Sequence, residues 1–229
     1  IKLILKRVLP MKFGILKERK NPPDRRVVFS PNELSRLKQE YQNVFIKVEH
    51  SDIRIFDDAQ YKNLGIEVTD DLSDCDVLFG VKEVPVENLI PNKSYFFFSH
   101  TIKKQPYNRK LLQAVLNKNI DLYDYETIVD SENRRLIGFG RYAGIVGAYN
   151  GIRAFGIKFE LFKLPKAETL SGKEALISHL KRVILPPLKF VITGTGKVGN
   201  GAKEILDAIK IKEVSVENYL TKNYTQAVY

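Results

Sequence analysis

Ionisable side chains follow four short apolar runs in the first half of the sequence, and Lys17, Glu18 and Arg19 follow the first of these runs, KFGIL. Lys82 and Glu83 come directly after DVLFGV, His100 follows SYFFFS, and Glu126 closes DLYDYE. Ligands of open parallel sheets bind beyond the carboxyl ends of the strands, so we expect these side chains to meet in one pocket. Lysine and histidine there suit proton transfer, and a nearby arginine would bind a carboxylate. The pattern predicts proton transfer around an amino acid.

Each of these residues also has a structural interpretation. Lys82 and Glu83 could end an exposed strand, and His100 could be a buried histidine with satisfied hydrogen bonds. Arginines in a loop before a helix, such as Arg26, are usually solvated. The convergence of several strand ends is what favours a functional site.

A second candidate site is the segment KFVITGTGKVGNGAKEIL, residues 189–206, whose glycines have the spacing G-x-G-x-x-G. The motif follows an apolar run and opens an amphipathic helix, which is the context of a dinucleotide-binding loop. The glycines would allow a tight turn, close approach of a pyrophosphate, and packing of helix on strand. The helix N-terminus favours phosphate charge. The predicted cofactor is NAD, bound by Gly194, Gly196, Lys197, Val198 and Gly199.

The run KEVSVEN after this helix predicts a second strand. Glu217 in it lies about 18 residues after the last glycine, near the spacing of roughly 20 expected for a ribose-binding acid. Glu213 competes for that role. A carboxylate here favours NAD, because it would repel the 2′-phosphate of NADP. The alternative for the whole segment is a glycine-rich turn in an α/β unit that binds no nucleotide.

The elements that must position these residues alternate between apolar runs and helical patterns, which predicts an α/β fold. We expect two Rossmann-like doubly wound domains, the second only partly present because a dinucleotide fold needs about five or six strands. Residues 1–10 are predicted to be an N-terminal extension, 11–141 a substrate-side catalytic domain, and 142–229 connecting helices with the start of the NAD-binding domain.

The strands of the first domain are predicted at 12–18, 44–49, 65–70, 76–81, 94–99 and 121–126. Helices are predicted at 30–43, 57–65, 105–119, 141–156 and 171–183, with Ser171 as the cap of the last.

The composition is that of an ordinary globular protein, 44% hydrophobic and 28% charged. No stretch approaches the ~18–20 apolar residues of a membrane span, and the single cysteine, Cys75, favours a reduced cytoplasm. The net charge of +10 leaves open nucleic-acid binding, a basic groove for anionic ligands, or scattered surface lysines. Basic residues are scattered and zinc-ligand spacing is missing, so we expect a small-molecule substrate, with no nucleic acid, membrane or metal. Assembly into a homo-oligomer stays open.

Several segments resemble a known superfamily. GILKERKNPPDRRVVFSP resembles the opening of alanine dehydrogenases and transhydrogenases, in which an arginine before a V-A-L-T-P-like run holds a substrate carboxylate. Arg26 has that position. LFGVKEVP, FFFSHTIKKQ and LYDYETIVDSENRRLIGFGRYAGIVGA are more specifically similar to the lysine-forming, NAD-dependent saccharopine dehydrogenases. The resemblance covers nearly everything from Met11 to the glycine loop.

The resemblance implies roles for individual residues. Lys82 and His100 would be the acid–base pair, with the lysine handling the proton of a secondary amine and the histidine assisting imine hydrolysis. The residues implied to tune pKa values or to bind substrate are Arg26, Glu83, Lys103, Glu126 and Arg135.

The activity implied is oxidation of the C–N bond of an amino acid, with saccharopine, NAD and water giving lysine, 2-oxoglutarate and NADH. One alternative is oxidative deamination of the alanine dehydrogenase type. The other is a non-catalytic module that senses a nucleotide or binds a partner.

Overall fold

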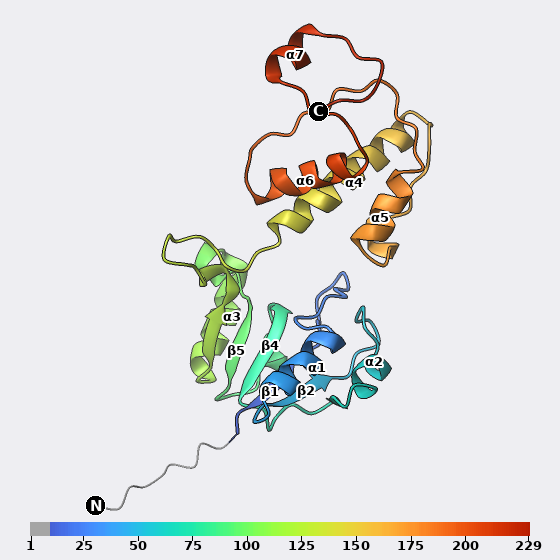
Figure 1. Ribbon diagram of the computed structural model, residues 1–229. Coiled ribbons are helices and arrows are strands. Elements are labelled where there is room, and N and C mark those ends of the chain that lie inside the picture. The colour runs from blue at the N-terminus through green and yellow to red at the C-terminus, as the bar shows by residue number, and fades with distance from the viewer. Residues whose placement is uncertain (1–9) are drawn as a thin grey trace, which may run out of the picture. The chain divides into compact units, whose positions relative to one another are not determined.

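The computed structural model describes residues 10–229, so the predicted extension lies outside the described residues except for its last position. The chain divides into two compact units (Figure 1), one ending at Gly138 and the other running from Phe139 to Tyr229. The sequence placed this boundary three residues later, between 141 and 142.

The first unit is built on one six-stranded parallel sheet of order β3-β2-β1-β4-β5-β6. The strands are β1 (Lys12–Ile15), β2 (Phe45–Glu49), β3 (Glu67–Thr69), β4 (Val77–Lys82), β5 (Ser94–Phe98) and β6 (Asp121–Asp124). The chain moves from β1 outward to β3 and then returns to β4 on the other side of β1. This is the doubly wound pattern, with its switch point between β1 and β4. The predicted α/β class is confirmed.

Helices cover both faces of this sheet, as a parallel sheet requires. The helices are α1 (Pro31–Glu40), α2 (Asp58–Lys62) and α3 (Arg109–Asn117). Leu34 of α1 and Tyr61 of α2 pack with Ile15 and Val48 on one face. On the other face, α3 packs on Leu78, Tyr95 and Phe97.

The start of α1 is fixed by the capping box that the sequence indicates. The backbone N–H of Glu33 donates to Ser30 Oγ at 3.3 Å, and the N–H of Ser30 donates to the Glu33 carboxylate at 2.8 Å. Pro31 begins the helix, where its missing N–H costs no hydrogen bond.

Strand β4 contains a bulge near its carboxyl end. Phe79 pairs with Phe96 and Lys82 pairs with Phe98, so β4 has one more residue than β5 over this interval. A bulge bends its strand and is often found beside a functional site. Lys82 is the last residue of the bulged strand.

The second unit is mainly helical, with α4 (Gly140–Lys158), α5 (Lys173–Leu180), α6 (Lys197–Ala208) and α7 (Val216–Thr221). Its core joins Tyr149 of α4, Leu176 of α5 and Ile205 of α6. The backbones of α4 and α6 touch: a Cβ on Gly144 would lie only 2.0 Å from the carbonyl oxygen of Val198. Only glycine permits so close an approach.

Three expectations for this unit are corrected. The runs 189–194 and 212–218 do not form strands: Lys189 and Lys212 each make only an isolated parallel bridge to Val228. From Val216 the second run is helix α7 instead. The residue that caps α5 is Gly172 rather than Ser171, and it makes no side-chain cap bond. Within residues 10–229, none of the helices combines the length and apolar character needed to cross a membrane.

Candidate functional site

The predicted acid–base residues lie at the carboxyl ends of β4 and β5. Lys82 ends β4, and His100 follows the end of β5 by two residues. Both lie beside the ring of Phe98: Lys82 Nζ is 6.0 Å from its centroid, and the imidazole centroid of His100 is 6.5 Å from it. The fold therefore brings the two residues to the same aromatic side chain.

Glu126, just beyond β6, gathers three cationic side chains. Its carboxylate accepts from His100 Nδ1 at 2.9 Å and pairs with Lys103 Nζ at 3.2 Å and Arg135 Nη1 at 3.5 Å. Lys103 Nζ also lies 3.0 Å from His100 Nδ1. Because His100 uses Nδ1 for both contacts, Nε2 is the ring atom that remains for proton transfer.

The charge state of Glu126 follows from two opposing effects. Burial raises the pKa of this carboxyl, but hydrogen bonds from His100 and Lys103 outweigh burial and leave the pKa below its ordinary value. The residue is only 6% exposed. A buried carboxylate that stays ionised is well suited to orient the imidazole.

The backbone around His100 holds this cluster in place. His100 has a φ of 58°, in the left-handed region, and starts the tight turn Thr101–Lys103. The turn brings Lys103 back over His100, whose carbonyl accepts from Asn108 Nδ2 at 3.0 Å. Ser99 Oγ donates to Asp124 at 2.5 Å, which joins the ends of β5 and β6.

Glu18 is a buried residue that the sequence placed among the ionisable strand-end residues without a specific role. It follows β1, is 7% exposed, and accepts from the backbone N–H of Val81 at 2.7 Å and of Lys82 at 2.9 Å. Burial raises the pKa of Glu18, and these two bonds partly offset the rise. Its place directly after a strand was visible in the sequence, but its burial was not.

Two buried polar atoms at these strand ends have no hydrogen-bond partner among the described residues. They are Glu83 Oε2 and the hydroxyl of Tyr125. The other oxygen of Glu83 lies 3.4 Å from Lys20 Nζ. Burial raises the pKa of Tyr125, and the charge of Glu18 adds to the rise. Buried polar atoms of this kind need a water molecule or a ligand.

The two arginines predicted to bind substrate carboxylates already contact carboxylates of the protein. Arg26 Nε donates to Asp24 Oδ1 at 2.9 Å, and this hydrogen bond lowers the pKa of Asp24. Arg135 reaches Glu126 and its side chain is 57% exposed. Binding of a substrate carboxylate would therefore involve sharing or exchanging these contacts.

In the second unit, the glycine loop has a geometry that suits a pyrophosphate. Gly194 has a φ of +91°, and Cβ atoms built on Gly194 and Gly196 meet no described atom within 4 Å. A Cβ on Gly199 would lie 2.2 Å from the carbonyl oxygen of Gly194, so a side chain cannot be accommodated there. The first residues of α6, Lys197 and Val198, follow directly. Open backbone at a helix N-terminus can bind phosphate.

A cavity of about 450 Å³ lies beside this loop. Its lining includes Gly194 and Gly199 together with Lys203 and Glu213, which form an ion pair. Glu217 instead lies exposed in the first turn of α7, so the strand-end position assumed for it does not exist. Its predicted contact with ribose remains a prediction without that support, and Glu213 has the better placement.

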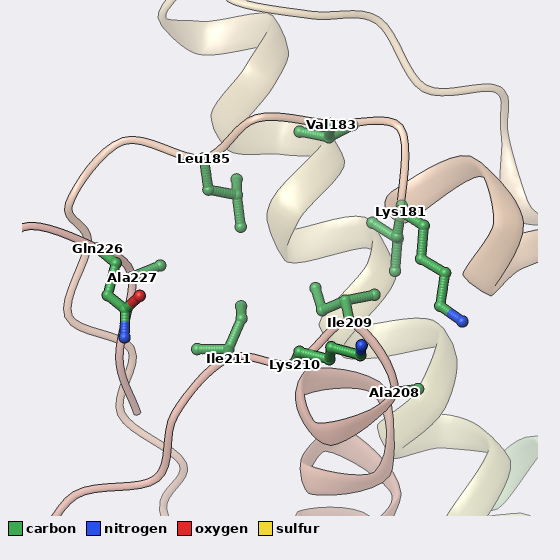
Figure 2. A pocket seen from close by; sticks show the side chains of 10 residues that line it. Lys181, Val183, Leu185, Ala208, Ile209, Lys210, Ile211, Gln226 and Ala227 are labelled. Atoms are coloured by element: carbon green, nitrogen blue, oxygen red, sulfur yellow. The ribbon is translucent and has the colours of Figure 1, made fainter.

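The second unit contains another cavity, of about 460 Å³, near the ends of α5 and α6. Figure 2 shows Leu185 and Ile211 pointing toward each other across it. The polar side chains in its lining are Lys181, Lys210 and Gln226. This lining is mostly aliphatic and lacks the acid–base pairing found at the ends of β4, β5 and β6.

Comparison with known proteins gives one family match. Residues 14–146 match the model of the N-terminal domain of alanine dehydrogenase/PNT. The curated relatives include alpha-aminoadipic semialdehyde synthase from Arabidopsis thaliana, 36% identical over 84% of this chain, and its mitochondrial counterpart from Bos taurus, 32% identical over 92%. A lysine-forming NAD(+) saccharopine dehydrogenase from Yarrowia lipolytica is 26% identical over 90%.

The solved structures include an L-alanine dehydrogenase that superposes on 96% of this chain with a TM-score of 0.59 and 20% sequence identity. At that identity the likeness shows the fold alone. The chain spans only part of each of these proteins: 20% of the Arabidopsis protein, 25% of the bovine one, and 60% of the Yarrowia and alanine dehydrogenase chains.

Proposed function

The chain belongs to the family of the alanine dehydrogenase/PNT N-terminal domain, and on that basis we propose that it is part of an NAD-dependent oxidoreductase acting on an amino-acid C–N bond. The proposed reaction is that of a saccharopine dehydrogenase: saccharopine, NAD and water give lysine, 2-oxoglutarate and NADH. The names of the relatives, saccharopine dehydrogenase and alpha-aminoadipic semialdehyde synthase, support an amino-acid dehydrogenase family.

One observation carries the proposal for this chain's own residues: Lys82 and His100 both lie beside Phe98, and Glu126 accepts a hydrogen bond from His100. We assign Lys82 to accept the proton of the secondary amine. His100 Nε2 then assists the addition of water to the imine carbon and the loss of lysine. Positioned acid–base groups of this kind typically contribute about 10²–10⁴-fold in rate.

The remaining residues bind and orient. Arg26 and Arg135 are assigned to the carboxylates of the substrate, since a guanidinium binds a carboxylate through two parallel hydrogen bonds. Glu83 presents a buried oxygen with no described partner, which suits the amine or ammonium of a substrate. Lys103 keeps a positive charge beside Glu126 and His100.

In the second unit, Gly194, Gly196, Lys197, Val198 and Gly199 are assigned to the dinucleotide. When bound, NAD accepts a hydride from the carbon next to the nitrogen. Glu213, which lines the cavity beside the loop, is proposed to bind the adenosine ribose. We also propose a cytoplasmic location on the strength of the single buried cysteine, Cys75.

Steady-state assays of the full-length protein test the proposal. NADH oxidation would be compared with lysine plus 2-oxoglutarate and with pyruvate plus ammonia, and NADPH would be tested in parallel. Turnover with the first pair supports a saccharopine dehydrogenase. Turnover with only the second pair replaces it with an alanine dehydrogenase, and silence with both while NADH still binds supports a non-catalytic nucleotide-binding module.

A further inference from the structure

The carboxylate of Glu18 accepts backbone hydrogen bonds that a neighbouring strand would normally accept in a sheet. Pairing between β1 and β4 ends at Ile15 and Phe79, with one further bond from the N–H of Leu16 to the Phe79 carbonyl at 2.8 Å. Beyond Phe79, β4 continues to Lys82 with no register to β1. The N–H groups of Val81 and Lys82 bond to the side chain of Glu18 instead.

The bulge in β4 explains how one carboxylate can accept from two successive residues. In a regular strand, consecutive N–H groups point to opposite sides. The extra residue between Phe79 and Lys82 disrupts this alternation. As a result, Val81 donates to Glu18 Oε1 and Lys82 donates to Glu18 Oε2.

The other side of the same segment is held in a similar way. Glu49, the last residue of β2, accepts from the backbone N–H of Lys17 at 3.0 Å and pairs with Arg19. Glu49 is 5% exposed. The segment after β1 is thus bonded to β2 through the carboxylate of Glu49 and to β4 through the carboxylate of Glu18.

Glu18 is also surrounded by the charged groups of the candidate site. Asp24, Arg26 and Tyr125 all lie close enough to interact electrostatically with it, and Lys82 interacts with Asp24 in the same way. One of the two backbone N–H groups that donate to Glu18 is that of Lys82, and the other is that of the residue before it. Glu18 is therefore bonded to the strand end that carries Lys82 and lies within electrostatic range of Arg26.

We infer that Glu18 is a positioning residue, whose carboxylate fixes the bulged end of β4 and so directs the Lys82 side chain into the substrate site. This inference rests on the proposed function, because it gives Glu18 a role through Lys82. It predicts that Glu18 influences turnover without touching the substrate.

Two substitutions of Glu18 test separately the length of its side chain and its negative charge. Glu18→Gln keeps the length, but its amide group has one acceptor oxygen and would turn a donor toward a backbone N–H. Glu18→Asp keeps the charge, but is about 1.5 Å shorter and cannot reach both N–H groups. Both variants should lower kcat by about 100-fold, the usual cost of a misplaced catalytic group, and leave KM and NADH affinity within about threefold. Glu49→Gln is the matched control and should keep kcat within about fivefold.

Amide hydrogen exchange, measured residue by residue by NMR on the full-length protein, gives a readout that does not need activity. The N–H groups of Val81 and Lys82 should exchange at least about tenfold faster in Glu18→Gln than in the wild type, while those of Tyr95 and Phe97 in β5 stay protected.

Unchanged exchange at Val81 and Lys82 overturns the inference, and so does full turnover when their protection is lost. An equal loss of kcat in Glu49→Gln also overturns it, because general loosening of residues 16–19 would then account for the effect. A wild-type protein without turnover on any substrate pair refutes the proposed function instead, and the exchange data still decide whether Glu18 holds the bulge.

Discussion

Replacing Glu126 by glutamine should destabilise the protein in a way that depends on pH. The bond from His100 goes to a buried carboxylate, and a hydrogen bond to a charged group is worth about 1.5–3 kcal/mol. The side chains of Lys103 and Arg135 are 44% and 57% exposed, so each of their ion pairs adds at most about 1 kcal/mol. Glutamine keeps one acceptor oxygen. We therefore expect the free energy of unfolding at pH 7 to fall by about 2 kcal/mol.

The pH dependence follows from the lowered pKa of Glu126 in the folded protein. A carboxyl with a lower pKa in the folded state stabilises the fold fully above its unfolded value of 4.5, and this stabilisation disappears as pH falls through the folded value. The wild type and Glu126→Gln should therefore differ at pH 7 and converge below pH 4.5.

Urea denaturation followed by circular dichroism at several pH values measures this difference. Glu132→Gln is the control, since Glu132 forms an ion pair with Arg134 at 66% and 67% side-chain exposure. It should change the free energy of unfolding by less than about 0.5 kcal/mol. Equal stability of wild type and Glu126→Gln at pH 7, or a gap that does not close in acid, would refute the reasoning.

The other predictions concern catalysis and the packing of the second unit. Lys82→Met should lower kcat by about two to four orders of magnitude with NADH affinity kept, and undiminished turnover would remove Lys82 from the mechanism. Arg26→Ala should raise KM for the amino-acid or oxo-acid substrate in steady-state assays. An unchanged KM would mean that Arg26 takes no part in substrate binding. Gly144→Ala should cost about 1–3 kcal/mol in a denaturation experiment, because its methyl group would meet the Val198 carbonyl. Gly147→Ala in the same helix meets no described atom within 4 Å and should be neutral or stabilising by up to about 1 kcal/mol.

The sheet of the first unit was predictable because its strands are continuous apolar runs. DVLFGV covers all of β4 except its last residue, Lys82, and SYFFFS contains β5; Lys82 and His100, which follow these runs, are the candidate acid–base pair. Strand order was not predictable from these runs, since any parallel arrangement buries them equally well. The burial of Glu18 was hidden for a related reason: between Lys17 and Arg19 it looks like one charge in a solvated stretch.

The second unit shows where local patterns mislead. The alternation in KEVSVEN is typical of a strand, but Ser215 accepts from the N–H of Asn218 at 3.2 Å and caps a helix instead. Glu217 in the first helical turn is also a helix-start signal. A strand needs a neighbouring strand, and among the described residues Lys189 and Lys212 form only isolated β-bridges, both to Val228.

The glycine loop leads into α6, and the start of α6 is packed tightly against α4. Gly144 lies against Val198, and a Cβ on Gly201 would be 2.1 Å from the Arg141 carbonyl oxygen. The two helices are therefore in direct backbone contact at these points, with no side chain between them that could change its rotamer. We therefore expect any rearrangement on ligand binding to be larger before Lys197 than within α6. A larger side chain on the buried face of α4 would consequently displace the loop, and the proposed nucleotide would then bind more weakly even though the substituted residue does not contact it.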